Sequence, residues 1–224
     1  MFITNSNAQK FDCPSKMTEY QDLFKAKKIA ESFDTWTAVS KNCPKENEAV
    51  YKDGIEIIQY KIDNAASTEE KENIFYTPAL AAYEDTNYRE AIEKFEIYMT
   101  KFPNGRYVNE TYFYLGNSML RTKDSVGAIA QFEKYLSTSL TPYAEYAAAK
   151  TAAYHYIRKD YAKALQYYQK LETVAAKPTS TFDAKLGIMR CAFLGANYEL
   201  ARTNADFVLE NAALTPVLKV EAEY

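Results

Sequence analysis

An internal repeat constrains the fold of this chain more than any other feature of its sequence. Four alanines stand 37, 36 and 37 residues apart, at Ala91, Ala128, Ala164 and Ala201. An apolar or small residue follows each alanine by four positions, and an apolar residue follows three positions later: Phe95 and Tyr98, Phe132 and Tyr135, Tyr168 and Leu171, Ala205 and Val208. This spacing places the residues on one face of an α-helix. A period of this length is typical of chains built from stacked supersecondary units.

A second helical pattern precedes each of these four helices. The clearest runs over residues 112–119, and its counterparts cover residues 74–84, 143–158 and 182–194. A proline beyond each of the four helices, at Pro103, Pro142, Pro178 and Pro216, is expected to end it, because its ring and missing N–H cannot continue the ladder. The repeating unit is therefore a helical hairpin. The predicted fold is an all-α solenoid in which each hairpin buries its apolar face against its neighbours.

One unit, residues 109–136, resembles a tetratricopeptide repeat. Tyr112 stands where that family usually has tryptophan, Leu115 and Gly116 match its Leu-Gly pair, and Ala128, Phe132 and Tyr135 match positions of its second helix. The resemblance covers residues 72–216, although the spacing of 36–37 residues exceeds the usual 34 and the terminal proline shifts by a couple of places. It implies a right-handed α-solenoid with a concave groove that binds a protein partner.

The N-terminal region is a weaker copy of the unit. Residues 27–39 fit the second helix, with Ser32 at the small position and Trp36 at the aromatic one, and residues 20–24 fit the first. A helix over 46–63 carries Tyr51, Ile55, Ile58 and Ile62 on one stripe, and another helix starts near Thr68. This region resembles the N-terminal repeats of exported tetratricopeptide proteins of the Bacteroidetes group.

The pattern predicts three regions. Residues 1–12 form a disordered tail or a signal-peptide remnant, residues 13–70 form degenerate repeat-like helices, and residues 71–224 form an array of about four repeats, cut short at the C-terminus. Each hairpin needs a first and a second helix, yet the segment 68–84 would have to be the second helix of one hairpin and the first helix of the next. Either one helix over 68–84 serves two hairpins, or two pieces of chain are joined near residues 75–78.

The chain ends and the cysteines bear on the cellular compartment. Ser6 and Ala8 are small residues at the −3 and −1 places of a signal-peptidase site, and the alternative is an ordinary polar tail. Cys13 and Cys43 either form a disulfide across one hairpin, as an exported protein allows, or stay reduced as small hydrophobes. The hypothesis is a periplasmic protein with a truncated signal peptide. The C-terminal residues 217–224 stop within a helical pattern, which predicts a longer original chain.

Composition excludes several functional classes. The net charge of −3 and pI of about 5.4 give no basic footprint for nucleic acid, and no 18-residue apolar run predicts a membrane span. His155 is the only histidine, so no metal site and no cofactor is expected. It has no orienting partner or nucleophile in a recognisable motif, so the chain is predicted not to be an enzyme and His155 to have a packing or hydrogen-bonding role.

The candidate binding residues are the side chains that would face the concave groove in the resembled family: Tyr76, Tyr83, Phe113, Asn117, Arg121, Tyr146, Tyr156 and Arg190. Tyr and Arg are common in recognition surfaces, although many of the 20 tyrosines could instead seal the interior. Because Phe113 and not Lys precedes Asn117 by one turn, the family's carboxylate clamp is not reproduced. The prediction is a scaffold that binds proteins of a cell-envelope assembly, such as an outer-membrane or secretion machinery. The alternative is a periplasmic protein that binds glycan or peptidoglycan.

Overall fold

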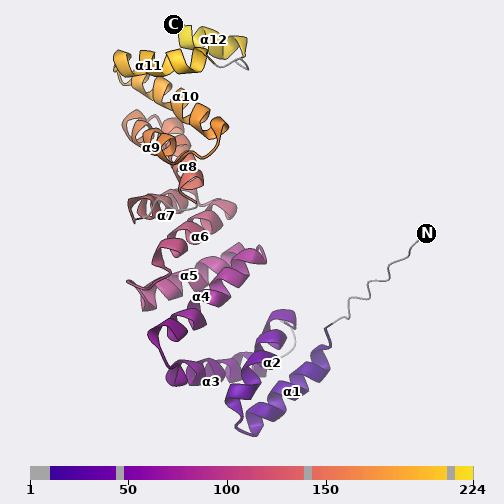
Figure 1. Cartoon of the computed structure of the whole chain (residues 1–224). Coiled ribbons are helices and arrows are strands. Elements are labelled where there is room, and N and C mark those ends of the chain that lie inside the picture. Colours follow the sequence, from indigo (N-terminus) through magenta and orange to yellow (C-terminus); the bar gives the residue numbers. More distant parts are fainter. Residues whose placement is uncertain (1–10, 44–47, 139–142, 211–214, 224) are drawn as a thin grey trace, which may run out of the picture. The chain divides into compact units, whose positions relative to one another are not determined.

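The described part of the chain is all-helical. The computed structural model describes residues 11–43, 48–138, 143–210 and 215–223, and these form twelve α-helices and no strand (Figure 1). The helices are α1 (Cys13–Lys25), α2 (Ile29–Asn42), α3 (Glu48–Asn64), α4 (Thr68–Glu84), α5 (Tyr88–Lys101), α6 (Val108–Arg121), α7 (Ser125–Thr138), α8 (Ala144–Ile157), α9 (Tyr161–Val174), α10 (Pro178–Leu194), α11 (Tyr198–Leu209) and α12 (Pro216–Glu223).

The chain divides into two compact units, Met1–Ile74 and Phe75–Tyr224. The division falls inside α4, which runs without a break through residues 75–78 and carries Pro78 in its interior. Proline has no N–H to donate to the carbonyl four residues earlier, here that of Ile74. The helical ladder therefore has its weakest step next to the boundary between the units. The structure has one continuous helix over residues 68–84.

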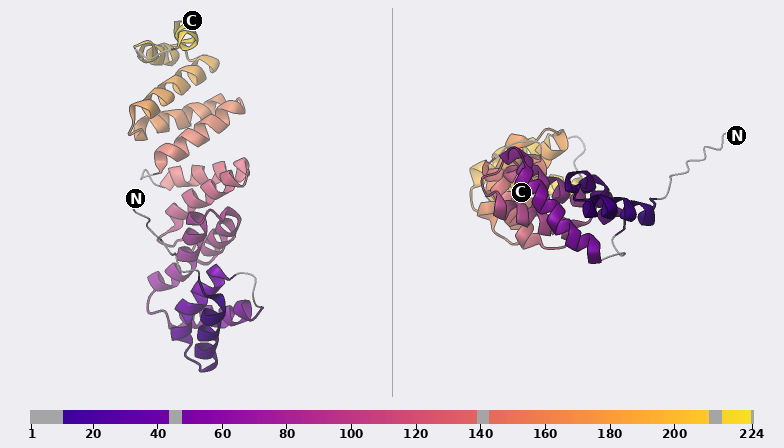
Figure 2. Two further views of the ribbon diagram at one scale, coloured as in Figure 1. Left: turned by 90° about the vertical axis from the view of Figure 1, so that its right-hand side faces the viewer. Right: turned by 90° about the horizontal axis from the view of Figure 1, so that it is seen from below.

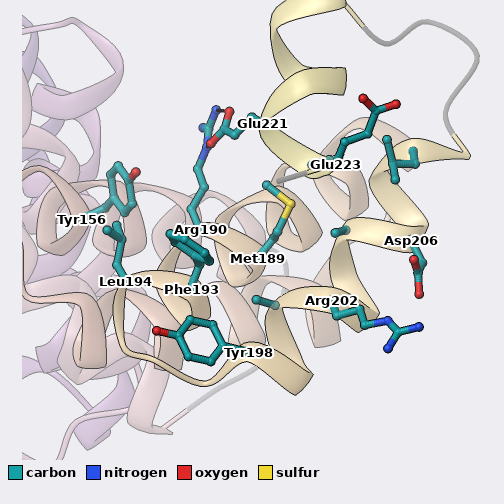
Figure 3. Close-up of a pocket in the computed structure, with 14 residues that line it drawn as sticks. Tyr156, Met189, Arg190, Phe193, Leu194, Tyr198, Arg202, Asp206, Glu221 and Glu223 are labelled. Atoms are coloured by element: carbon teal, nitrogen blue, oxygen red, sulfur yellow. Dashed lines mark hydrogen bonds and ion pairs between the residues drawn. The ribbon is translucent and has the colours of Figure 1, made fainter.

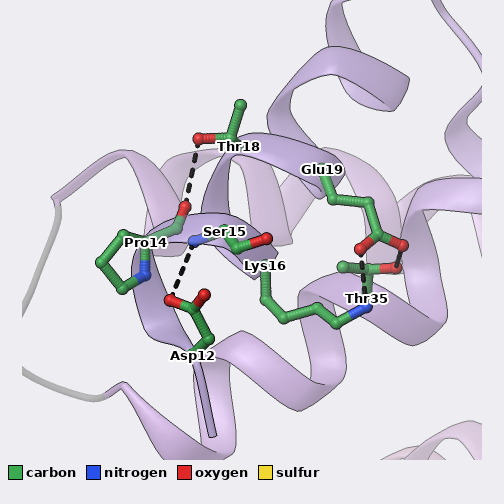
Figure 4. A network of polar contacts seen from close by, with 7 residues as sticks. All are labelled: Asp12, Pro14, Ser15, Lys16, Thr18, Glu19 and Thr35. Atoms are coloured by element: carbon green, nitrogen blue, oxygen red, sulfur yellow. Dashed lines mark hydrogen bonds and ion pairs between the residues drawn. The ribbon is translucent and has the colours of Figure 1, made fainter.

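The first unit is held by a small core and one covalent bond. Tyr20, Val39 and Val50 are buried between α1, α2 and α3, and a disulfide joins Cys13 to Cys43 with their Cα atoms 5.9 Å apart. This bridge closes the α1–α2 hairpin at its open end. Further along the same hairpin, Glu19 of α1 accepts hydrogen bonds from Lys16 at 2.6 Å and from Thr35 of α2 at 3.3 Å (Figure 4).

Trp36 determines which side of α3 faces α2. Its Nε1 donates to the Val50 carbonyl at 2.8 Å, and its ring lies so close to Gly54 that a Cβ there would stand 2.3 Å from a ring carbon. The expected apolar stripe of α3 is therefore wrong in part, since Tyr51 and Ile55 are 65% and 73% exposed. Glycine lets the indole approach the α3 backbone on another side of the helix.

The second unit is a stack of four helical hairpins, followed by α12 (Figures 1 and 2). The first hairpin is formed by the part of α4 from Phe75 onward with α5, and the others are α6–α7, α8–α9 and α10–α11. The repeat-defining residues form its interior: each of the four aligned alanines is at most 7% exposed, and Phe95, Tyr98, Phe132, Tyr135, Leu171 and Val208 are at most 2% exposed. Alanine at the helix crossing lets the two backbones approach closely. The predicted α-solenoid of stacked hairpins is confirmed.

All hairpin turns of this unit share one backbone design. The second residue after each first helix has a left-handed φ, at Thr86 (60°), Lys123 (70°), Lys159 (63°) and Ala196 (60°). The next residue is Asn or Asp, and its N–H donates across the turn to a carbonyl of the last helical turn, as from Asp124 to Met119 at 2.8 Å. That pattern closes the first helix. In three turns the same Asn or Asp side chain also caps the second helix, which fixes the hairpin angle.

Aromatic side chains fasten successive hairpins to each other. The hydroxyl oxygens of Tyr98 and Tyr135, on the second helices, accept hydrogen bonds from the backbone N–H groups of Tyr107 and Tyr143, at 3.0 and 3.3 Å. At the next junction Leu171 replaces the tyrosine. There Glu145 accepts bonds from Ala176 N at 2.8 Å and from the Ser180 hydroxyl at 2.6 Å, and these bonds lower the pKa of its carboxyl group.

Two of the four repeat prolines have a different role from the one predicted. Pro178 and Pro216 are the first residues of α10 and α12, whereas the preceding helices end earlier, at Val174 and Leu209. Proline suits this first position because its fixed φ is helical and its missing N–H would have no intrahelical partner. Pro178 and Pro216 therefore begin the next helix, whereas Pro103 lies two residues beyond the end of α5, as predicted. Pro142 lies outside the described residues.

Candidate functional site

The second unit contains an open pocket of about 820 Å³ at its α10–α12 end (Figure 3). The lining residues come from the C-terminal half of α10, one side of α11 and the last turn of α12, with Tyr156 contributed by α8. Ala201 and Ala205 of α11 lie on one wall, and Met189 of α10 lies on another. The wall is therefore made largely of small or apolar side chains.

A size difference between successive repeats explains why the space is open. In the preceding hairpin, Tyr168 of α9 fills the place next to the following helix, and a Cβ on Gly187 of α10 would lie 2.4 Å from its ring. The equivalent residue of α11 is Ala205, 37 positions later. An alanine removes the ring that fills this position in the earlier repeat. The small side chain of Ala205 therefore contributes to the open space between α11 and α12.

Large apolar side chains stand at the mouth of the pocket. Phe193 is 52% exposed, Leu194 is 47% exposed and Tyr198 is 63% exposed. The rings of Phe193 and Tyr198 meet edge to face, with centroids 5.8 Å apart, and so hold each other in place. Neighbouring exposed apolar side chains around a hollow are typical of a binding surface.

An ion pair between α10 and α12 borders the pocket. Arg190 donates from Nε to Glu221 Oε1 at 2.6 Å and from Nη2 to Oε2 at 2.7 Å (Figure 3). The hydrogen bonds lower the pKa of the Glu221 carboxyl group and raise the pKa of the guanidinium group. Tyr156 lies beside this pair, and partial burial raises the pKa of its hydroxyl. The bidentate geometry holds α12 against α10 and supplies a fixed polar edge.

The structure places five of the eight predicted groove residues at three locations, and the other three in the interior. Tyr156 and Arg190 line the pocket. Tyr83 and Arg121 lie together around Tyr88, whose ring is 5.9 Å from the guanidinium carbon of Arg121. Tyr146 is 37% exposed on α8, with the Lys150 ammonium 5.2 Å from its ring centre. These five remain accessible, at least in part.

The other three are wrong as exposed binding residues. Tyr76, Phe113 and Asn117 are 8%, 4% and 7% exposed. Tyr76 stacks on Tyr107 with ring centres 4.1 Å apart, and Phe113 stacks on Tyr143 at 4.0 Å. In both cases the stacking partner is the residue just before the next first helix, so the aromatic pair seals the junction between hairpins. Asn117 is enclosed in the same stack.

Sequence reasoning missed Phe193, Leu194 and Tyr198. A signal was present, because Tyr198 occupies the place of Tyr88 and Tyr161 in earlier repeats, and each pairs with an aromatic residue at the end of the preceding helix. The alanine at position 205, where the preceding repeat has Tyr168, was visible in the sequence too. Recognising the pocket would have required comparing side-chain volumes between repeats.

The one histidine is part of the interior. His155 is 7% exposed, its Nε2 is 2.9 Å from Glu133 Oε1, and its ring stacks on Tyr167. Asp160 lies 3.7 Å from Nδ1. The predicted packing and hydrogen-bonding role is confirmed. Across the described ranges, no three His, Cys, Asp or Glu side chains are grouped as metal ligands would be.

Comparison with known proteins agrees with the repeat architecture. Residues 68–148 match the family described as YfiO, outer membrane lipoprotein. The matched segment runs from α4 into α8 and contains two of the four aligned alanines, Ala91 and Ala128, the Leu115–Gly116 pair and two of the hairpin turns. The chain is similar to this family over these residues, which include the unit that resembles a tetratricopeptide repeat. No curated protein matches it.

Two solved structures are similar in outline. One is PilF of Pseudomonas aeruginosa, at 15% sequence identity and a TM-score of 0.47, over 95% of this chain and 97% of PilF. The other is RapI in its apo form, at 12% identity and a TM-score of 0.47, over 95% of this chain and 67% of RapI. Within the residues that the structure describes, none of the helices combines the length and apolar character needed to cross a membrane.

Proposed function

We propose that this repeat protein is a non-catalytic scaffold that binds a protein partner, with the α10–α12 pocket as its principal anchor point. The observation that carries the proposal is an apolar hollow rimmed by exposed aromatic side chains, next to a polar edge that is already in place. Large apolar anchors inserted into such hollows supply most of the affinity in many protein interfaces.

The pocket suits an apolar side chain on a partner helix or extended segment. The anchor would lie over Ala201 and Ala205 and contact Phe193 and Tyr198 at the mouth. Arg202 and Asp206 are exposed at successive turns of α11 and provide polar contacts along the same line. Because Arg190 is already paired with Glu221, this edge needs little rearrangement on binding, which lowers the entropic cost.

The binding face extends beyond the pocket in this proposal. Tyr146 on α8, and Tyr83 with Arg121 at the other hairpins, are accessible aromatic and cationic groups on the first helices of the array. They give a longer partner segment further contacts. A catalytic role has little support, because His155 is enclosed between two carboxylates and Tyr167.

We place the protein in the cell envelope, as an accessory component of an outer-membrane or secretion assembly in the periplasm. Two observations support this. The family that matches residues 68–148 is described as an outer membrane lipoprotein. The Cys13–Cys43 disulfide is of a kind that persists in oxidising compartments and is rare in the cytosol.

The test is a crosslinking pull-down from native envelope fractions with three forms of the protein. The double variant Phe193→Ala, Tyr198→Ala is expected to lose a partner that the unmodified protein enriches. Phe207→Ala is the matched control, since Phe207 is a 39% exposed aromatic of α11 that does not line the pocket. Equal enrichment by the double variant would contradict the proposal. Recovery of oligosaccharide in place of protein would favour glycan binding.

A further inference from the structure

The turns of the two middle hairpins carry a concentration of positive charge. Lys123 lies in the α6–α7 turn, Arg158 and Lys159 lie in the α8–α9 turn, and Lys163 lies in the first turn of α9. All four side chains are exposed. The two turns are 36 residues apart in the repeat and belong to hairpins stacked directly on each other, so they stand at the same edge of the array. The chain as a whole has a net charge of −3, so this positive edge is a local feature.

Two of these lysines occupy backbone positions that disfavour them. Lys123 has a φ of 70° and Lys159 has a φ of 63°. Glycine and asparagine adopt this left-handed conformation at lower cost and usually end helices of this type. Lys163 stands in the first turn of α9, where the helix dipole favours acidic residues. The dipoles at the C-termini of α6 and α8 favour a cation near Lys123, Arg158 and Lys159, but they do not account for Lys163 at the start of α9.

The carboxylates of the turns are committed to the backbone. Asp124 accepts from Gly127 N at 2.9 Å, and Asp160 accepts from Lys163 N at 3.2 Å, each as the cap of its helix. No ion pair links the four basic side chains to a carboxylate in the part of the chain that the structure describes. Their charges are thus available to an external anion.

Aliphatic side chains project from the same turns. Ile157, the last residue of α8, is 78% exposed, and Val126, in the first turn of α7, is 68% exposed. Protein ligands are usually held in hollows, whereas protruding tips that combine lysines with aliphatic groups suit a flat lipid surface. The ammonium groups meet the lipid phosphates, and the aliphatic groups enter the boundary between headgroups and acyl chains.

We propose that Lys123, Val126, Ile157, Arg158, Lys159 and Lys163 form a membrane-docking edge that binds anionic phospholipid headgroups. The edge is peripheral, and its attachment is electrostatic with a small apolar contribution. It is independent of the proposed partner pocket, since none of the six residues lines that pocket. A scaffold attached in this way would keep its binding face beside the membrane.

The test measures sedimentation of the full chain with vesicles of phosphatidylcholine, with and without 30% phosphatidylglycerol, at low and high salt. Binding is expected only with the anionic lipid and is expected to weaken as salt rises. The double variant Lys123→Asn, Lys159→Asn should reduce the anionic-vesicle partition coefficient by about tenfold or more, because each basic residue near such a surface contributes substantially. Asparagine tolerates the left-handed φ, so the variant keeps its turns.

Lys27→Asn is the matched control. Lys27 occupies the same left-handed position in the α1–α2 turn, with a φ of 57°, and lies outside the proposed edge. Vesicle binding should be unchanged in this variant. Equal binding to neutral and anionic vesicles, or equal binding by the double variant, would overturn the proposal. Binding to polyglutamate with no binding to vesicles would also overturn it and would identify an acidic polypeptide as the ligand.

Discussion

The contact between Gly187 and Tyr168 allows a sharp test of how successive hairpins pack. A Cβ added to Gly187 would lie 2.4 Å from two carbons of the Tyr168 ring and 2.5 Å from a third. The ring is held between α9 and α10, so it cannot move aside as the end of a flexible side chain could. Overpacking of this kind costs about 1–3 kcal/mol, and the overlap here places it toward the upper end.

The helix propensity of alanine opposes this cost. Alanine is more favourable than glycine in a helix interior by about 1 kcal/mol. The net effect expected for Gly187→Ala is therefore a loss of about 1–2 kcal/mol, measured as a lower urea midpoint by circular dichroism. Gly195→Ala is the control, because its nearest contact would be 3.2 Å from the Cys191 carbonyl, and it should change the midpoint little.

A double-mutant cycle tests whether the Tyr168 ring causes the loss of stability in Gly187→Ala. In a Tyr168→Ala background the clash is absent, so the Gly187→Ala change should become stabilising by about 0.5–1 kcal/mol. An unchanged or higher midpoint for Gly187→Ala in the unmodified protein would refute the packing described here. An equal loss of stability in both backgrounds would show that the ring is not the obstacle.

Three further predictions concern other parts of the chain. Ala196→Gly should raise the melting temperature, with a gain of about 0.5–1 kcal/mol, because Ala196 has a φ of 60° that glycine adopts without strain. Burial, reinforced by Glu133, raises the pKa of Tyr167 from 10.0 to about 12, because the folded protein favours the neutral phenol. The stability that this preference contributes is complete below pH 10 and is lost as pH rises toward 12. Urea midpoints across that window should fall, and fall less in Tyr167→Phe. Reducing the Cys13–Cys43 bridge should cost the first unit about 3–4 kcal/mol, seen as a lower denaturation midpoint in the fluorescence of Trp36, whereas an unchanged midpoint would count against a stabilising bridge.

The repeat architecture was predictable because it depends on local rules that the sequence states several times. Ala128 and its equivalents mark the helix crossings, and Asp124 and its equivalents mark the turns. The left-handed residues of those turns were harder to foresee, since lysine, threonine and alanine occupy a place where glycine is usual. The Asn or Asp that follows each of them is the better signal.

The binding residues were less predictable, because their exposure depends on contacts between repeats. Tyr76 and Phe113 have the residue types of a recognition surface, yet each is covered by a tyrosine from the next hairpin. Their sequence positions gave no sign of this cover. The pocket, in turn, is widened by the small side chain of Ala205, and this difference is visible only by comparison with Tyr168.

The central claim, that the α10–α12 pocket holds a protein partner, is tested most directly by site-specific photocrosslinking in native envelope fractions. A photoreactive phenylalanine analogue at Phe193 should give one reproducible crosslinked protein, because this side chain stands at the mouth of the pocket. The same analogue at Phe207, which does not line the pocket, should not give that product. No protein product from position 193, or the same product from both positions, would contradict the assignment of the pocket as the binding site.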